Sequence, residues 1–346
     1  MASLFLILAS VCGYAAVSSA PRLDGAFIQF DARSYATWTP QEWRDTVDRM
    51  HAAGLNIIIL QYLQARDGAV PPTSESFIPE VPCAPDPIRL ILDQAERHGM
   101  TVFLGLRLDK RLLGSVFLNC PDELRAALAD ELPRNVTLAH FLAGHYRLKH
   151  RRSFGGWYLP VEFANYEETA QKPGDGWVTQ FNGVTTALSS ACDRFAPGPV
   201  AISPYFNGAV GPGSGLVDAV QMGKNLARLL VGTNVSVVML QDGVGVRNIP
   251  AGQVDGYVLP FLWSIKDACR NLSQPGREVE FWLNVESFTQ LDQNTRVPAE
   301  IGRLLTQIAL GRARAGKVVT FEFTHYLGSE PLYHEYLRLI MARCGR

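Results

Sequence analysis

Short apolar runs recur along the chain, and each is followed by a segment in which apolar residues recur at helical spacing. The apolar runs cover residues 25–30, 55–63, 100–107, 155–163, 199–206, 235–243, 278–288 and 317–326. Near-continuous apolar strands are typical of a parallel sheet that is buried on both faces. Eight such strands, each followed by a helix, predict the α/β class and a single (β/α)8 barrel, the TIM-barrel architecture.

Helix start and stop residues separate the predicted strands. In the segment 39–54, Thr39 suits the N-cap, Pro40 the first helical position and Glu42 the third. Gly54 ends this segment, and Gly99 ends the next one in the same way. These residues support the strand–helix alternation that the barrel requires.

Composition and charge agree with one large globular domain. The chain has 346 residues, of which 47% are hydrophobic and 19% are charged, so there is enough apolar material for a large core. The formal net charge is -1 and the sequence has no basic run. Nucleic acid and an anionic membrane surface are therefore not expected as the main partners.

The first 20 residues differ from the rest of the chain. The apolar run LFLILASVCGYAAV (4–17) is followed by small residues, a pattern typical of a signal peptide with a cleavage site after Ser19. A buried N-terminal helix or an uncleaved hydrophobic anchor is the alternative. We predict that residues 21–346 form the barrel domain, that the protein is secreted or periplasmic, and that no membrane span remains after processing.

Five cysteines would remain after processing, in an oxidising compartment. Cys83 and Cys120 lie in loops that we expect to be neighbours, so they are the best candidate for a disulfide bond. An odd number leaves at least one thiol free or bonded between chains. The spacing of Cys and His residues does not suggest a zinc site, and we predict neither a metal nor another cofactor.

Polar residues follow the predicted strands at their carboxyl ends. In a (β/α)8 barrel these ends meet on one face, where the active site lies. The candidate catalytic residues at these positions are Glu162, Asp242 and Glu286. The candidate substrate-binding residues are Gln29, Asp31, Gln61, Arg107, Tyr205, Gln241, Asn284, Glu322 and Tyr326. Carboxylates, amides and aromatic rings together are suited to binding a sugar.

Two carboxylates at the ends of strands four and seven suggest a chemistry. A glycosidic bond is cleaved between one carboxylic acid and a second carboxylate, which acts as nucleophile or base. Glu162 would be the general acid and Glu286 the nucleophile, with Arg107 and Asn284 as donors that hold Glu286 ionised. The structural alternative is a buried network in which these glutamates pair with Arg107, but one arginine cannot neutralise four buried carboxylates.

The chain resembles the glycoside hydrolase superfamily of (β/α)8 barrels with catalytic glutamates on strands four and seven. More narrowly, it resembles a largely bacterial family of glycosidase-like barrels classed as a domain of unknown function. The segments that carry the resemblance lie between about residues 25 and 340 and are FIQF, GLNIIILQY, GMTVFLGL, GWYLPVEF, SPYF, QDGVG, LNVESF and FEFTHY. The resemblance implies an acid/base role for Glu162 and a nucleophilic role for Glu286.

The sequence departs from the superfamily pattern at three places. Val161 stands where the superfamily has Asn before its catalytic acid, and THY (324–326) stands where a Trp is common. Asp242 is a carboxylate that the two-glutamate scheme does not require. An inverting mechanism with Asp242 as the partner therefore stays open beside the retaining one.

The predicted function is that of a glycoside hydrolase that acts on a polysaccharide or glycan by a two-carboxylate mechanism, in the retaining form. The alternative is a non-catalytic barrel that binds glycans during extracellular polysaccharide assembly or export. A metal-dependent hydrolase would need a His-x-His on the first strand, which FIQFDAR lacks. Schiff-base chemistry would need a lysine at a carboxyl strand end, and Lys317 begins its strand instead.

Overall fold

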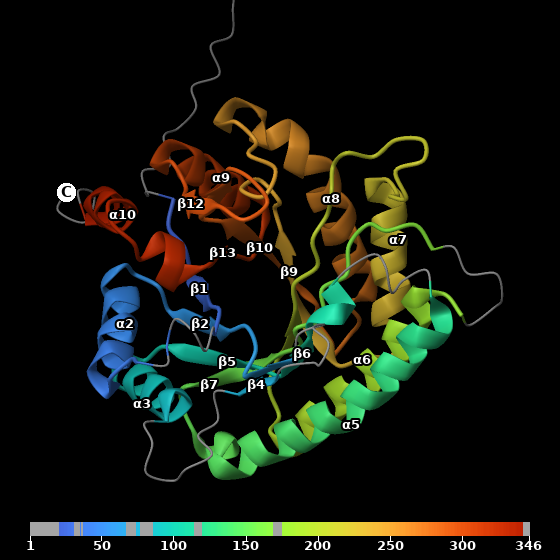
Figure 1. The fold of residues 1–346 in the computed structure, drawn as a ribbon, viewed down its shortest axis with the longest axis horizontal. Coiled ribbons are helices and arrows are strands. Elements are labelled where there is room, and N and C mark those ends of the chain that lie inside the picture. Colours follow the sequence, from blue (N-terminus) through green and yellow to red (C-terminus); the bar gives the residue numbers. More distant parts are fainter. Residues whose placement is uncertain are drawn as a thin grey trace, which may run out of the picture.

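The computed structural model describes residues 21–30, 35, 37–66, 74–76, 86–113, 120–168 and 175–341. Within these residues, parallel strands close into a barrel in the order β1-β13-β10-β9-β8-β7-β5-β2 (Figure 1). The strands are β1 (Gly25–Ile28), β2 (Ile57–Leu60), β5 (Thr101–Gly105), β7 (Phe154–Tyr158), β8 (Val200–Ile202), β9 (Val235–Gln241), β10 (Glu280–Glu286) and β13 (Lys317–Phe321). The predicted (β/α)8 barrel is confirmed, with one strand in each of the eight apolar runs.

A ring of helices covers the outside of the barrel (Figure 1). The helices are α2 (Pro40–Ala52), α3 (Pro87–His98), α5 (Pro121–His145), α6 (Trp177–Phe195), α7 (Ala219–Leu230), α8 (Val254–Leu272), α9 (Ile301–Arg314) and α10 (Leu332–Met341). The Thr39 side chain accepts from the Glu42 N–H and Glu42 bonds back to the cap, so the predicted capping box is present. Gly99 adopts the left-handed conformation with φ of 67° and ends α3, as expected.

The core has two layers that follow from the alternation of side chains along each strand. The inner layer fills the barrel and contains Phe27, Ile57, Ile59, Phe103, Tyr158, Ala201, Val237, Met239, Trp282 and Val319. The outer layer packs the sheet against the helices. Trp157 and Trp282 are 0% and 2% exposed, so both are core residues.

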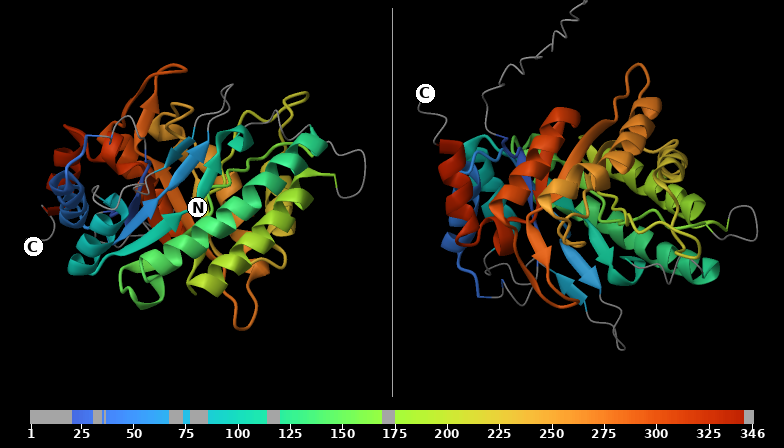
Figure 2. Two further views of the ribbon diagram at one scale, coloured as in Figure 1. Left: turned by 60° about the horizontal axis from the view of Figure 1, so that its bottom comes forward. Right: turned by 90° about the horizontal axis from the view of Figure 1, so that it is seen from above.

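Two small sheets follow the barrel strands at the end where the predicted site lies. One is an antiparallel hairpin of β11 (Phe288–Gln290) and β12 (Arg296–Pro298), directly after β10. The other contains β3 (Gln64–Arg66), β4 (Ser74–Ser76) and β6 (Arg107–Asp109), of which β3 and β6 continue the chain beyond β2 and β5. The views in Figure 2 place both sheets at the same end of the barrel. Neither was predicted from the sequence.

Several of the predicted features lie in segments outside the described residues. Residues 1–20 are among them, so the signal peptide stays a prediction. Cys120, Cys192 and Cys269 carry free thiols, so the predicted Cys83–Cys120 bond is not formed at Cys120; Cys83 and Cys344 lie outside the described part. In the segments that the structure describes, none of the helices has the length and apolar character to cross a membrane.

Candidate active site

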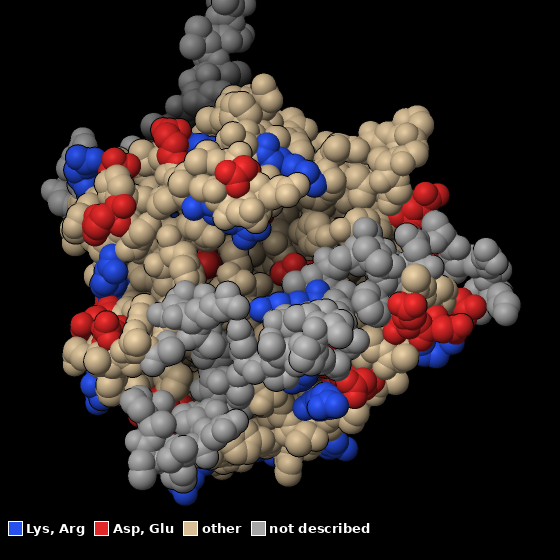
Figure 3. Space-filling model, viewed as in Figure 1, with Lys and Arg blue, Asp and Glu red and all other residues tan. Residues whose placement is uncertain are grey.

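A cavity of about 550 Å³ opens at the carboxyl ends of the barrel strands. Figure 3 shows the hollow in the barrel face, with acidic residues inside it and basic residues beside it. The predicted residues that line this cavity are Gln29, Gln61, Glu162, Tyr205, Gln241 and Glu286. The strand ends therefore bring together six residues that are far apart in the sequence, including both candidate glutamates.

Glu162 lies in the loop after β7, four residues beyond the last strand residue, Tyr158. The Gln61 side-chain amide donates to Glu162 Oε1 at 3.3 Å. Burial raises the pKa of Glu162 to about 7, against the opposing effects of Gln61, the Arg296 charge and a hydrogen bond from Gln241. A carboxyl group with this pKa keeps its proton in a substantial share of molecules at neutral pH, as a general acid must.

Glu286 is the last residue of β10 and is 6% exposed. Its Oε2 accepts a hydrogen bond of 2.7 Å from the Val246 backbone N–H, in the loop after β9. A Cβ atom on Gly245 would lie 2.1 Å from the Phe288 carbonyl oxygen and 3.0 Å from Glu286 Cβ. Gly245, the last residue of the QDGVG segment, therefore lets this loop approach Glu286 closely enough for the loop backbone to bind the carboxylate.

Burial raises the pKa of Glu286 to about 8, and the neighbouring Asp242 charge adds to the rise. The Val246 and Gly245 N–H groups and the Arg296 charge oppose it. The environment of Glu286 thus differs from that of Glu162 because a second carboxylate lies behind it.

Asp242 is fully buried and does not line the cavity. Its Oδ1 accepts from the backbone N–H groups of Glu286 and Val244, both at 3.2 Å. Its Oδ2 accepts from the Gln307 amide at 2.6 Å, and burial raises the pKa of Asp242 to about 6. Asp242 therefore orients the Glu286 backbone and the loop after β9, and acts on the cavity through Glu286.

Three further predicted residues lie beside or beneath the cavity instead of lining it. Asn284 is buried and donates to Ser203 Oγ at 3.2 Å. Glu322 is fully buried and accepts from the His325 backbone N–H at 2.6 Å. The Tyr326 ring packs against Phe288 with centroids 5.0 Å apart. Asp31 lies outside the described residues.

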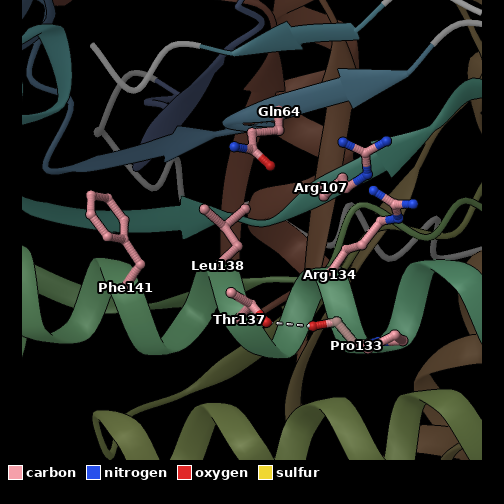
Figure 4. Close-up of a pocket in the computed structure, with 7 residues that line it drawn as sticks. All are labelled: Gln64, Arg107, Pro133, Arg134, Thr137, Leu138 and Phe141. Carbon is pink, nitrogen blue, oxygen red and sulfur yellow. Dashed lines mark hydrogen bonds between the residues drawn. The ribbon is translucent and has the colours of Figure 1, made fainter. Parts of the chain in front are cut away.

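Contrary to the prediction, Arg107 does not reach Glu286. Its Nε donates to Glu131 Oε2 at 2.8 Å, and both side chains are less than 10% exposed, at 9% and 5%. Arg107 lines a different cavity, of about 530 Å³, between β3 and α5, next to Arg134 and Gln64 (Figure 4). The expected donors for Glu286, Arg107 and Asn284, are thus replaced by the backbone of the loop after β9.

Sequence reasoning missed the cations that line the cavity. They are Lys110 in η1 (Lys110–Leu113), Arg247 after β9, and Arg296 in β12. The Arg296 guanidinium lies 4.8 Å from the Phe288 ring centroid, and its charge lowers the pKa values of Glu162 and Glu286. The turn-forming segment 291–295 between two short β-prone stretches is a hairpin pattern that could have indicated this loop structure.

Comparisons with known proteins agree with the barrel. The family described as "Domain of unknown function (DUF4434)" matches residues 23–334. A crystal structure from Bacteroides thetaiotaomicron, described as "a putative alpha-L-fucosidase", has a TM-score of 0.67 and 20% identity, covering 98% of this chain and 99% of that one. An endo-1,4-beta-D-mannanase from Thermotoga petrophila has a TM-score of 0.58 and 11% identity, covering 93% and 99%. No curated protein sequence matches the chain.

The structural neighbours named are glycoside hydrolases by their descriptions. At 20% identity and below, the likeness establishes the fold alone. Chemistry has to be argued from the residues of the cavity.

Proposed function

The chain belongs to the DUF4434 family, and from its cavity we propose that it is a glycoside hydrolase acting on a polysaccharide or glycan through Glu162 and Glu286. The observation that carries this proposal is that the two carboxyl groups line one cavity from β7 and β10 in different environments. Paired carboxyl groups held in different environments are what acid and nucleophile roles require.

In the proposed reaction, the Glu162 carboxylic acid donates its proton to the glycosidic oxygen while the bond from that oxygen to the anomeric carbon breaks. The Glu286 carboxylate attacks the anomeric carbon and forms a covalent glycosyl-enzyme. The Glu162 carboxylate then takes a proton from water, whose oxygen displaces Glu286. The two displacements retain the anomeric configuration and regenerate both starting groups.

The raised pKa values restrict how often the site is in the productive form. That form needs Glu286 ionised and Glu162 protonated. Because the pKa of Glu286 is raised further than that of Glu162, only a minor share of the free molecules has this arrangement near neutral pH. The backbone N–H groups of the loop after β9 favour it, because they stabilise a negative charge on Glu286 alone, whereas the Arg296 charge lowers the pKa values of both glutamates.

A non-catalytic barrel that binds glycans during extracellular polysaccharide assembly or export is the second candidate. Two features favour it: Val161 stands before Glu162, and burial beside Asp242 raises the pKa of Glu286, which favours the protonated form of this side chain at neutral pH. In this second function the cavity binds a glycan, but no glycosidic bond is cleaved.

Turnover on a panel of neutral and acidic glycans separates the two candidates. We expect wild-type protein to release reducing ends from at least one glycan, and Glu286→Gln and Glu162→Gln to lose roughly 10²–10⁴-fold in rate. Glu278→Gln is the matched control, because Glu278 is exposed and lies before β10 at the opposite end of the barrel. Glycan binding without cleavage that depends on Glu286 would favour the second candidate.

We also propose that residues 1–20 direct export and that the mature protein is secreted or periplasmic. The apolar run and the small residues after it support this proposal. N-terminal sequencing of protein recovered from its native host tests it: a mature chain starting near residue 20 is expected, whereas an intact N-terminus would overturn it.

A further inference from the structure

The cavity contains more positive side chains than the proposed bond cleavage requires. Its described lining residues include three cations, Lys110, Arg247 and Arg296, and two carboxyl groups, Glu162 and Glu286. Because both carboxyl groups have raised pKa values, the carboxyl charge that opposes the cations near neutral pH is reduced. A neutral sugar could accept hydrogen bonds from these side chains, but it would not neutralise their charge, whereas an anionic sugar would do both.

Arg296 has a clear role within the site. Its charge acts on both glutamates and on Tyr326, and its Nε donates to Gln290 Oε1 at 3.4 Å. Arg296 therefore interacts with other groups of the protein, and its role does not explain why Lys110 and Arg247 also line the cavity.

The Arg247 charge acts on Tyr205 and Tyr257, but it is not among the main influences on the pKa of either glutamate. Within the described part of the chain, neither Lys110 nor Arg247 forms an ion pair or hydrogen bond with another residue. Arg247 is exposed at the rim on the β9 side, whereas Lys110 is half-buried on the β6 side. Two cations from separate sides of one cavity, neither with a hydrogen bond or ion pair in these segments, are available to a negatively charged ligand.

We propose that the substrate is an anionic glycan, whose sugar carboxylate or sulfate groups are bound by Arg247 and Lys110 while Glu162 and Glu286 flank the glycosidic bond. The proposal rests on the function proposed above and names its substrate class. The guanidinium of Arg247 offers two parallel N–H donors to a planar carboxylate, and Lys110 offers a compact charge. The apolar rings of Phe206, Phe288 and Phe321 in the lining supply surface for the sugar C–H faces.

The test measures binding separately from cleavage, using Glu286→Gln protein to prevent turnover. The carboxylate probes are alginate, polygalacturonate and hyaluronan, each compared with its carboxyl-reduced, uncharged form. The sulfate probe is dextran sulfate compared with dextran. We expect at least one acidic polymer to bind roughly tenfold or more tightly than its uncharged form at low ionic strength, and less so as salt is added.

Single variants in the same background show whether the cavity cations cause the preference. We expect Arg247→Gln and Lys110→Gln each to weaken binding of the preferred polymer roughly three- to tenfold and to leave binding of its uncharged form unchanged. Arg270→Gln is the control, because Arg270 is exposed near the end of α8, outside the lining of this cavity.

The inference is overturned if none of the acidic polymers binds more tightly than its uncharged form, or if the cavity variants behave like Arg270→Gln. If wild-type protein cleaves a neutral glycan through Glu286 and shows no preference for charged glycans, the proposed function stands and this inference is overturned. If the protein binds an acidic polymer in a salt-dependent way but wild-type protein never cleaves it, the inference about the ligand stands and the proposed hydrolase function is overturned.

Discussion

Removing the charge of Asp242 tests the electrostatic account of the site without touching the cavity wall. Asp242→Asn keeps the size of the side chain, and its oxygen can still accept from the Val244 and Glu286 N–H groups. The Asn amide nitrogen would face the Gln307 amide, whose Oε1 has no hydrogen-bond partner among the described residues. A rotation of the Gln307 amide by 180° supplies an acceptor, so we expect the variant to fold.

The size of the effect follows from the causes of the raised pKa of Glu286. After burial, the Asp242 charge is the largest contribution that raises this pKa to about 8. Its removal is expected to lower the pKa of Glu286 by about 1–2 units, or roughly 1.4 kcal/mol for each unit. Such a drop raises the productive fraction of the free enzyme, because more Glu286 is ionised while Glu162 still carries its proton.

The assay is the pH dependence of kcat/KM, because this parameter reports the ionisation of the free enzyme. For wild-type protein we expect a narrow bell with limbs near the pKa values of about 7 and about 8. In Asp242→Asn, the limb that follows Glu286 moves to lower pH, so the optimum shifts to acid by about half a unit or more. An unchanged bell, or a shift of the optimum to alkaline pH in a folded variant, would refute the reasoning.

Three other changes test separate parts of the account. Removing the positive charge by Arg296→Gln should raise the pKa values of Glu162 and Glu286 further. The bell-shaped pH profile of kcat/KM should then move to alkaline pH, in the opposite direction to Asp242→Asn. A pH profile equal to that of the control Arg270→Gln would contradict this. Glu286 has a folded-state pKa raised above the ordinary value of a glutamate, so its contribution to stability is fully present at acid pH below that ordinary value and is lost as pH rises from there to about 8, by roughly 1.4 kcal/mol per unit. Thermal unfolding at several pH values should therefore show a smaller loss of stability between acid and alkaline pH for Glu286→Gln than for wild-type protein, and an equal loss would be the contrary result. Gly245→Ala places a Cβ 2.1 Å from the Phe288 carbonyl oxygen and should destabilise the protein by about 1–3 kcal/mol in denaturant unfolding. The control is Gly252→Ala, whose Cβ would have no neighbour within 4 Å and should not destabilise the protein. Equal effects of the two substitutions would show that the loop has room to move.

The barrel and the pair of glutamates could be predicted because they depend on local pattern and on one general rule. Continuous apolar runs such as 57–60 and 101–105 identify buried parallel strands, and the carboxyl ends of such strands meet on one face. Glu162 and Glu286 follow or end their strands, so the rule places them in one cavity without any knowledge of side-chain contacts.

The roles of the charged residues around that pair could not be predicted in the same way. Arg107 follows β5, as the rule requires, but it pairs with Glu131 on α5, and no local pattern announces this contact. Asp242 follows β9 directly, yet its side chain is turned into the protein, where Gln307 on α9 binds it. Arg296 reaches the cavity only because the β11–β12 hairpin folds back over the barrel end, which depends on tertiary packing.

The anomeric configuration of the first-formed product shows whether Glu286 acts as the nucleophile. Once a cleaved glycan has been found, NMR spectra recorded in the first moments of the reaction, before mutarotation, show which anomer is released. The account predicts the same configuration as in the substrate, because Glu286 and then water each displace a group at the anomeric carbon. Release of the opposite anomer would contradict Glu286 as the nucleophile and would require a single displacement by water, with Glu286 or another carboxylate as the base.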